Sequence, residues 1–347
     1  MNGEGQTIRE SISKLADGHT LTRQDAHAAL VEIMNGEATP SQIAAFITAL
    51  RIRGETSDII AGCAQAMREH FTAIEHHADI VVDTCGTGGD GARTFNISTA
   101  AAFVAAGAGV TVAKHGNRSV SSKCGSADVL SSLGVDITIS PDETSECLNE
   151  LGIAFLFAPV LHPAMKHAIG PRREIGIRTV FNILGPLSNP AGARHGVLGV
   201  YSRSLVPTLA EAAASLGAER VFVVHGTDGL DEITLTGPTL VGEVVNGMVS
   251  IREITPEDAG LKPCLPDQLA GGGPGENADI MTDILSGEKS PRRDIVLFNA
   301  AAAIVAGGKA GNLKDGVDLA AESIDSGSAA EKLEKLVRFT TSKGSNS

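Results

Sequence analysis

Hydrophobic positions in the first eighty residues recur at helical spacing. Apolar residues at 30–34 lie three to four positions apart, and Asn35-Gly36 after them is a typical helix end. A second helical pattern covers 43–50, after a Thr-Pro-Ser start signal, and a third follows Thr56-Ser57-Asp58. Because no strand pattern interrupts them, we predict a small helical domain over residues 1–79.

The pattern changes at Ile80, where short runs of β-branched and aliphatic residues begin to alternate with helical stretches. We predict helices at Ser98–Ala106 and Pro207–Leu216, a loop over 261–276 and a frayed serine-rich C-terminal tail. Continuous apolar strands between helices are typical of a mostly parallel sheet covered on both faces, so we predict an α/β domain over 80–347. The predicted strands are Ile80–Val82, Val110–Ala113, Ile137–Ile139, Ala154–Phe157, Val197–Val200, Val221–Val224 and Thr239–Val245.

Composition restricts the core and the partners. Of 347 residues 42% are hydrophobic, but only ten are Phe, one is Tyr and none is Trp, so the core must be aliphatic. The net charge of −13 argues against a protein that binds nucleic-acid phosphates or anionic lipid. We therefore expect no nucleic-acid partner and no membrane partner.

The chain has the features of a cytoplasmic protein. Its apolar runs are shorter than the ~20 residues that a membrane-spanning helix needs, and its polar N-terminus is unlike a signal peptide. Five cysteines form no CxxC pair, so we expect reduced thiols that pack as small buried hydrophobic residues.

A glycine-rich segment, Asp83–Gly91 (DTCGTGGDG), directly follows the first predicted strand. Glycine can adopt positive φ and direct backbone N–H groups at an anion, with a helix N-terminus behind it. The segment formally contains GxGxxG, but a dinucleotide site needs an acid at the end of the second strand. That strand ends instead in Lys114–Arg118, which fits a polyanion better. A tight turn without a ligand is the alternative.

Asn96–Thr99 stands at the start of the following predicted helix. Asn and Ser are common N-cap residues, whereas hydroxyl groups facing a glycine-rich turn also suit phosphate or a Mg²⁺ ion bound to it. By itself the segment favours neither interpretation. Together with the glycine turn, we favour a ligand.

Lys114–Asp128 contains three cations, four serines and two glycines. Such clusters are usually solvated, but this one follows a predicted strand at the edge where open α/β sheets bind ligands. Lysine and arginine there would bind phosphate oxygens. For His115 we favour hydrogen bonding or shape over a role as a catalytic base.

Two further groups could carry chemistry. The adjacent carboxylates Asp231 and Glu232 follow the Val221–Val224 strand and could bind Mg²⁺ or form an ordinary polar turn. Arg172 or Arg173 could bind a substrate carboxylate, although a surface salt bridge is the ordinary role of such residues. We find no nucleophile beside a base and predict no certain catalytic residue.

With these residues assembled, the chain resembles the anthranilate phosphoribosyltransferase family over nearly its whole length. Six landmarks in order carry the resemblance and are much more specific than a lone GTGGD: Asp83–Thr99, Val112–Asp128, His162–Ala168, Arg172–Gly192, Asp228–Thr239, and Glu276–Ile280 with Asn299–Ala303. Ser131-Ser132, where an acid is expected, and Gly170-Pro171, where a valine is more usual, depart from the family pattern.

The resemblance implies a Mg²⁺-dependent transfer of the phosphoribosyl group from 5-phosphoribosyl 1-pyrophosphate (PRPP) to the amine of anthranilate, the second step of tryptophan biosynthesis from chorismate. It assigns to PRPP the residues Gly86, Gly89, Asp90, Thr94, Asn96, Ile97, Ser98, Thr99, Lys114, His115, Gly116, Asn117, Arg118, Ser119, Val120, Ser121, Ser122 and Ser126. It assigns to anthranilate Gly86, Asn117, His162 and Arg172, with His115 along the same channel, and to two Mg²⁺ ions Ser98, Asp231 and Glu232.

The family fold is a small helical domain hinged to a larger α/β domain, and a homodimer is implied. Helices from about 162–185 would join the small domain. Two rivals remain. A pyrimidine nucleoside phosphorylase shares the fold, but the HGNR and DGLDE sequences speak against it. A non-catalytic nucleic-acid-binding relative is disfavoured by the negative charge and the intact carboxylates.

Overall fold

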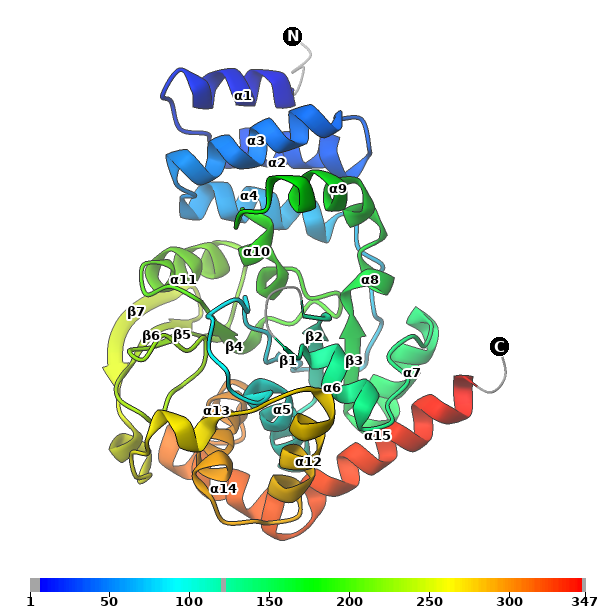
Figure 1. The fold of residues 1–347 in the computed structure, drawn as a ribbon, viewed down its shortest axis with the longest axis vertical. Helices are drawn as coiled ribbons and strands as arrows, with labels where there is room; N and C mark the ends of the chain where they lie inside the picture. The colour runs from blue at the N-terminus through cyan, green and yellow to red at the C-terminus, as the bar shows by residue number, and fades with distance from the viewer. Residues whose placement is uncertain (1–6, 120–122, 345–347) are drawn as a thin grey trace.

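Helices form the N-terminal part of the chain in the computed structural model, which describes residues 7–119 and 123–344 (Figure 1). At each of the first four helix starts a threonine side chain accepts a hydrogen bond from a backbone N–H of the first turn, which satisfies one of the donors that have no partner there. The four helices are α1 (Ile8–Ala16), α2 (Arg23–Met34), α3 (Pro40–Arg53) and α4 (Ser57–Arg68).

One sheet of seven strands organises the rest of the described chain, in the order β3-β2-β1-β4-β5-β6-β7. Its first five strands in this order run parallel, and β6 and β7 add an antiparallel hairpin at one edge. The predicted α/β fold with a mostly parallel sheet is therefore confirmed. The strands are β1 (Val82–Asp83), β2 (Val112–Gly116), β3 (Ile153–Phe157), β4 (His195–Gly199), β5 (Arg220–Gly226), β6 (Thr239–Val245) and β7 (Met248–Ile254).

Helices cover both faces of the sheet (Figure 1). On β5, Phe222 and Val224 join the core that contains α5 and α13, whereas Val221 and Val223 join the core that contains α11. The remaining helices are α5 (Ile97–Gly107), α6 (Ser126–Ser132), α7 (Pro141–Leu151), α8 (Ala158–Leu161), α9 (Lys166–Ile175), α10 (Phe181–Leu184), α11 (Leu205–Ser215), α12 (Pro274–Leu285), α13 (Pro291–Ala306), α14 (Leu313–Asp325) and α15 (Ser328–Gly344).

The N-terminal helices share a hydrophobic core with part of the sheet. Fully buried Phe46 and Leu50 of α3 belong to the same apolar cluster as Leu209 of α11 and Val223 of β5. The helix α9 packs against α3 and α2, and α10 packs against α4. The division of the chain at residue 79 stays a prediction, because this core extends across it.

Several predicted boundaries change. Ile137–Ile139 is not a strand: the Asp136 carboxylate accepts hydrogen bonds from the N–H and hydroxyl of Thr138, which closes a turn before α7. Conversely, β7 was not predicted, because polar residues interrupt its apolar ones and no continuous apolar run marks it; most of its residues are exposed. The second strand extends to Gly116, so Lys114 lies inside it.

The described residues also test the predictions for the loop, the C-terminal tail, the cysteines and membrane-spanning helices. The predicted loop at 261–276 contains a 3₁₀ turn, Pro266–Leu269, and the first turn of α12. The helix α15 runs to Gly344, and the rest of the C-terminal tail lies outside the described residues. All five cysteines are free thiols, four of them buried, as predicted. In the described ranges no helix has the length and apolar character needed to cross a bilayer.

Candidate active site

The predicted site residues gather where the strand order reverses. The chain continues from β1 to β2 and β3 on one side and adds β4 and β5 on the other. Segments that leave the carboxyl ends of β1 and β4 therefore separate, and this crevice is the usual ligand position in open α/β sheets. The glycine-rich segment follows β1 in this crevice, and Asp231-Glu232 comes from the segment after β5.

The glycine-rich segment folds back onto the end of β4 and onto Asp231. Thr87 N donates to the Gly199 carbonyl at 2.8 Å, and Gly88 N donates to Asp231 Oδ2 at 2.8 Å. Gly88 and Gly89 have φ of 63° and 76°, a region that favours glycine. A Cβ on Gly86 would lie 2.8 Å from Asp231 Oδ2, so a larger residue there would displace the carboxylate that accepts from Gly88 N.

Asp231 and Glu232 reach the surface but are surrounded by protein on most sides. Burial, followed by repulsion from Asp90, raises the pKa of Asp231 well above its ordinary range. Burial, followed by repulsion from Asp231, likewise raises the pKa of Glu232. Three carboxylates in so small a space would be stabilised by a cation, and hard oxygen ligands of this kind suit Mg²⁺.

Glu232 also caps the helix α5. Its Oε1 accepts a hydrogen bond from Ser98 N at 3.1 Å, and a carboxylate is favourable at this positive end of a helix. Asn96 occupies the N-cap position, but its side chain makes no capping hydrogen bond and therefore does not cap the helix.

Asn96 is held instead by Asn277 of α12, a residue that the site prediction missed. Asn277 Nδ2 donates to Asn96 Oδ1 at 3.0 Å, and Asn277 Oδ1 accepts from Gly272 N at 2.7 Å. Asn277 is only 1% exposed. Its position in the ENADI landmark was the available signal, but no local pattern connects it with Asn96, because the two lie 181 residues apart.

Lys114 extends from β2 to the start of α5. Its Nζ donates to the Thr84 carbonyl at 2.9 Å and lies 3.4 Å from Ser98 Oγ. The side chain is almost fully buried. Its positive charge lowers the pKa of Glu232 and partly offsets the effects of burial and of Asp231. The cation thus lies beside Ser98 and close to Glu232, two of the candidate metal ligands.

Asp128 organises the cationic loop after β2. Its carboxylate accepts hydrogen bonds from Ser119 N and Gly125 N at 3.0 and 2.9 Å and pairs with Arg118 Nη1 at 2.9 Å. Ser126 Oγ donates to the Asn117 carbonyl at 3.3 Å. The sequence prediction ended its landmark at Asp128 without giving it a role. Val120, Ser121 and Ser122 lie outside the described residues.

His115 and His162 face each other, with their Nε2 atoms 3.1 Å apart. His115 Nδ1 lies 3.1 Å from the Gly185 carbonyl, which can only accept, so Nδ1 carries the proton and His115 Nε2 accepts from His162. Burial, with a further contribution from His162, lowers the pKa of His115 to about 3, and burial lowers the pKa of His162 to about 4. Both rings are neutral near pH 7, which favours hydrogen bonding for His115.

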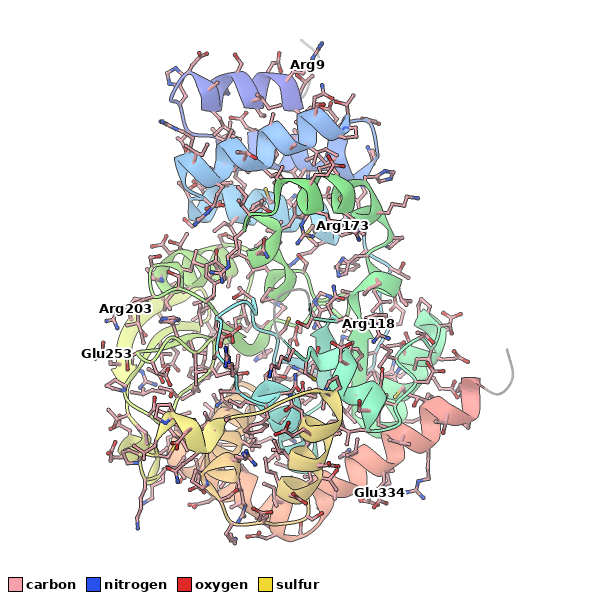
Figure 2. The ribbon with its side chains drawn as sticks, viewed as in Figure 1. Arg9, Arg118, Arg173, Arg203, Glu253 and Glu334 are labelled. Carbon is pink, nitrogen blue, oxygen red and sulfur yellow. The ribbon has the colours of Figure 1, made fainter. Side chains whose placement is uncertain are left out.

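Arg172 lies on α9, and its guanidinium is 5.1 Å from the centre of the Phe181 ring. Burial lowers the pKa of this guanidinium. No acidic side chain within the described ranges forms a salt bridge with Arg172 or with Arg173, which is exposed (Figure 2). The salt-bridge interpretation thus does not describe Arg172, and its charge is available to a ligand carboxylate.

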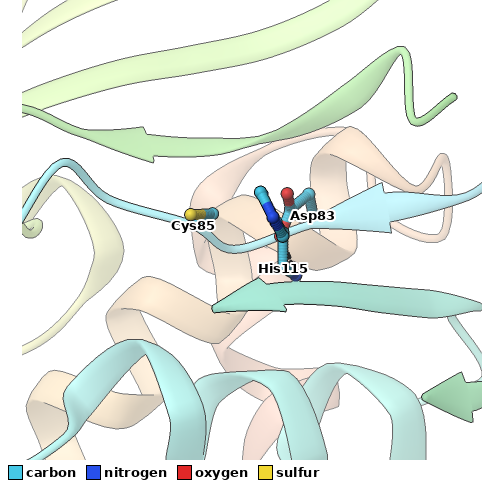
Figure 3. A group of neighbouring side chains, drawn as sticks. All are labelled: Asp83, Cys85 and His115. Atoms are coloured by element: carbon cyan, nitrogen blue, oxygen red, sulfur yellow. Dashed lines mark hydrogen bonds between the residues drawn. The ribbon is translucent and has the colours of Figure 1, made fainter. Parts of the chain in front are cut away.

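Asp83, Cys85 and His115 form a further cluster (Figure 3), in which one potential ligand atom from each lies within 4.8 Å of the others. Asp83 accepts from Asn189 Nδ2 at 2.7 Å and from His115 N at 3.0 Å, and burial raises its pKa to about 6. Burial also raises the pKa of the Cys85 thiol. Since these hydrogen bonds join β1 to β2, we interpret Asp83 as a structural residue.

Comparison with known proteins identifies the family. Residues 9–71 match the helical bundle domain of the glycosyl transferase family, and residues 78–330 match its a/b domain. An anthranilate phosphoribosyltransferase of Pelotomaculum thermopropionicum is 56% identical over 333 residues, which are 96% of each chain.

Solved structures agree in fold. The anthranilate phosphoribosyltransferase of Thermus thermophilus is 46% identical with a TM-score of 0.91 and covers 95% of this chain and 99% of its own. The Saccharomyces cerevisiae enzyme, solved in complex with PRPP and Mg, is 32% identical with a TM-score of 0.88 and covers 96% and 98%. Matched over nearly its whole length, the chain belongs to the glycosyl transferase family, among the anthranilate phosphoribosyltransferases.

Proposed function

We propose that this enzyme transfers the phosphoribosyl group of PRPP to the amine of anthranilate, giving N-(5-phosphoribosyl)anthranilate and pyrophosphate in tryptophan biosynthesis. The observation that carries the proposal is the approach of Asp231 and Glu232 to the glycine-rich segment and the first turn of α5. Yeast relatives have been solved with PRPP and Mg and with 4-fluoroanthranilate, which supports both substrates.

Mg²⁺ fits the residues at this site. Burial, together with neighbouring carboxylates, raises the pKa values of Asp231 and Glu232, and Ser98 adds a hydroxyl oxygen at the same helix start. We propose that these three residues hold two Mg²⁺ ions together with the pyrophosphate. When bound, the metal supplies positive charge that offsets the charge of the pyrophosphate.

The chain's own residues would position the substrates. The C1–O bond to pyrophosphate breaks, a C1–N bond to anthranilate forms, and the amine nitrogen then gives up one proton. Backbone N–H groups of the glycine-rich segment and of the α5 start would stabilise the departing anion. Arg172 would bind the anthranilate carboxylate. An aryl amine attacks without a strong base. Neutral His115 and His162 therefore need only orient the anthranilate ring and exclude water.

We also propose a cytoplasmic homodimer in which residues 1–79, with helices from 162–185, act as a small domain. Free cysteines support the compartment. Exposed Ile52 on α3 and Ile169 on α9 offer apolar surface for a second copy. Light scattering on the purified protein tests this arrangement, and a monomer at micromolar concentration would contradict it.

The decisive assay follows the loss of anthranilate fluorescence with PRPP, with and without Mg²⁺. Turnover should require all three components and disappear in Asp231→Ala/Glu232→Ala, while the exposed Glu211→Ala control stays at the wild-type rate. Wild-type rates in the double variant would contradict the metal assignment. Turnover of a pyrimidine nucleoside with phosphate would favour the phosphorylase, and salt-sensitive binding of single-stranded DNA would favour the nucleic-acid-binding relative.

A further inference from the structure

Arg178 lies in the connector 176–180 between α9 and α10, and it contacts the glycine-rich segment. Its guanidinium donates a hydrogen bond to the Gly89 carbonyl, and a Cβ on Gly89 would lie only 3.5 Å from Arg178 Nη2. The same guanidinium lies 4.3 Å from the centre of the Tyr201 ring, at the end of β4. Three segments distant in sequence therefore meet at this one side chain.

The glycine-rich segment needs anchors outside itself. Gly88 and Gly89 adopt positive φ, and glycine loses more conformational freedom on ordering than any other residue. The first half of the segment is held at the end of β4, where Thr87 N donates to the Gly199 carbonyl and Thr87 Oγ1 accepts from Tyr201 N at 3.1 Å. Arg178 holds the second half, at Gly89.

Arginine is well suited to this contact. Its planar guanidinium can stack on an aromatic ring while its N–H groups donate in the same plane, whereas lysine offers a point charge without a flat face. Stacking on Tyr201 thus keeps the guanidinium within hydrogen-bonding reach of the Gly89 carbonyl. The connector also follows directly after α9, so it links the helix of Arg172 to the glycine-rich segment.

We propose that Arg178, stacked on Tyr201, is a positioning residue that holds the glycine-rich segment in the conformation that binds the pyrophosphate of PRPP. This role rests on the proposed phosphoribosyl transfer. It also predicts that PRPP binding changes the surroundings of Tyr201, because ligand and tyrosine contact the same short segment through Gly89 and Thr87.

Steady-state kinetics gives the first test. Arg178→Ala should raise the KM for PRPP roughly fivefold to tenfold, as expected for one lost charge-assisted hydrogen bond at a partly exposed site, with a smaller change in kcat. Arg178→Lys should recover only part of this loss. The matched control is Arg203→Ala, since Arg203 is exposed two residues after Tyr201 and pairs with Glu253 at 2.8 Å (Figure 2).

The single tyrosine gives a second, independent readout. With one Tyr and no Trp in the chain, the tyrosine band in near-ultraviolet circular dichroism reports Tyr201 alone. PRPP with Mg²⁺, without anthranilate, should change this band in the wild type and in Arg203→Ala. The change should be clearly smaller in Arg178→Ala, where only the contact between Tyr201 N and Thr87 Oγ1 still joins the tyrosine to the segment. Tyr201→Phe should keep the wild-type KM because the ring remains, and Tyr201→Leu should raise it as Arg178→Ala does.

The outcomes separate this proposal from the proposed function. An active wild type whose KM for PRPP is unchanged in both Arg178→Ala and Tyr201→Leu would overturn the role of Arg178 and leave the transferase standing. A folded wild type that neither turns over anthranilate nor binds PRPP in calorimetry would overturn both. If Arg178→Ala does not fold, Arg178→Lys and Tyr201→Leu carry the same test.

Discussion

At the scale of single residues, Glu232 combines two functions. Its carboxylate caps α5 through Ser98 N, and it lies beside Asp231 in the group that we assign to Mg²⁺. Burial and the neighbouring charge both disfavour its ionised form. Without a metal ion, the ionised carboxylate therefore lowers the stability of the fold. A strained arrangement of this kind is common at functional sites.

Glu232→Gln should stabilise the metal-free protein while abolishing Mg²⁺-dependent turnover. The raised pKa means that ionisation of Glu232 costs free energy in the fold, and an amide avoids this cost. Because the unfolded carboxyl ionises at its ordinary pKa of 4.5 and the folded one near 8, the advantage of the variant should grow as pH rises between these values. Urea unfolding with chelator across this pH range measures it.

The matched control is Glu211→Gln on the exposed surface of α11. Its stability difference from the wild type should not depend on pH. A Glu232→Gln protein that is less stable than the wild type at every pH would mean that the cap to Ser98 outweighs the cost of ionisation.

Contacts between elements explain how the site is shaped, and Asn277 is the clearest case. It joins α12 to the start of α5 through Asn96 and holds the Gly272 turn. These contacts connect segments that no local pattern relates. The predicted loop at 261–276 therefore has an ordered end that lies against the candidate PRPP site.

Asn277→Ala should leave Asn96 Oδ1 and Gly272 N without this partner. We expect a loss of about 2 kcal/mol in the free energy of unfolding, as for other buried hydrogen-bonding groups. We also expect a raised KM for PRPP, because the Asn96 side chain would then be held, among the described residues, only by Cys124. Chemical unfolding and steady-state kinetics measure the two effects. Unchanged values in both would contradict the role assigned to Asn277.

The β6–β7 hairpin makes an element-scale prediction away from the site. Asn246 and Gly247 form its turn with φ of 49° and 79°, the left-handed pair typical of two-residue hairpins. Gly247→Ala should lower the free energy of unfolding by about 1 kcal/mol, since alanine disfavours this conformation. Thermal unfolding measures the loss, and kcat/KM should stay at the wild-type value.

The control for the hairpin is Gly311→Ala, where φ is ordinary and a Cβ would meet open space. It should be nearly neutral. Equal stability of the two variants would contradict the assigned turn. The Asn-Gly pair is visible in the sequence, so it was the signal by which β7 could have been predicted.

At the scale of the whole molecule, one site collects residues from both sides of the strand-order reversal. The glycine-rich segment follows β1, and Asp231 and Glu232 follow β5. Binding of a metal and PRPP between these segments should therefore stabilise the fold as a whole.

Mg²⁺ should raise the melting temperature, and PRPP with Mg²⁺ should raise it further. The rise should grow with pH as Asp231 and Glu232 ionise, because their raised pKa values leave them partly protonated near neutral pH. Differential scanning fluorimetry at several pH values measures this effect. Asp231→Ala/Glu232→Ala should not respond to Mg²⁺ alone, and an equal response there would place the metal elsewhere.

By itself the sequence determined the local features of this protein. Helix caps, apolar strands and glycine positions depend on neighbouring residues, so the fold class and the landmarks Asp83–Thr99 and Val112–Asp128 could be predicted. Ile137–Ile139 was predicted wrongly because a β-branched run was not weighed against the turn formed by Asp136. Strand length was similarly uncertain, since pairing between strands decides where each one ends.

Only the tertiary structure decided which distant groups meet. Glu232 caps a helix 134 residues away, and Arg178 contacts Gly89 across 89 residues of chain. Such contacts depend on the order of the strands and on the packing of α9 and α12, and no periodicity records these. The residue types that carry the chemistry of the site could therefore be read from the sequence. The contacts that hold those residues in place were determined by packing, because a hydrogen bond requires proximity in space and not along the chain.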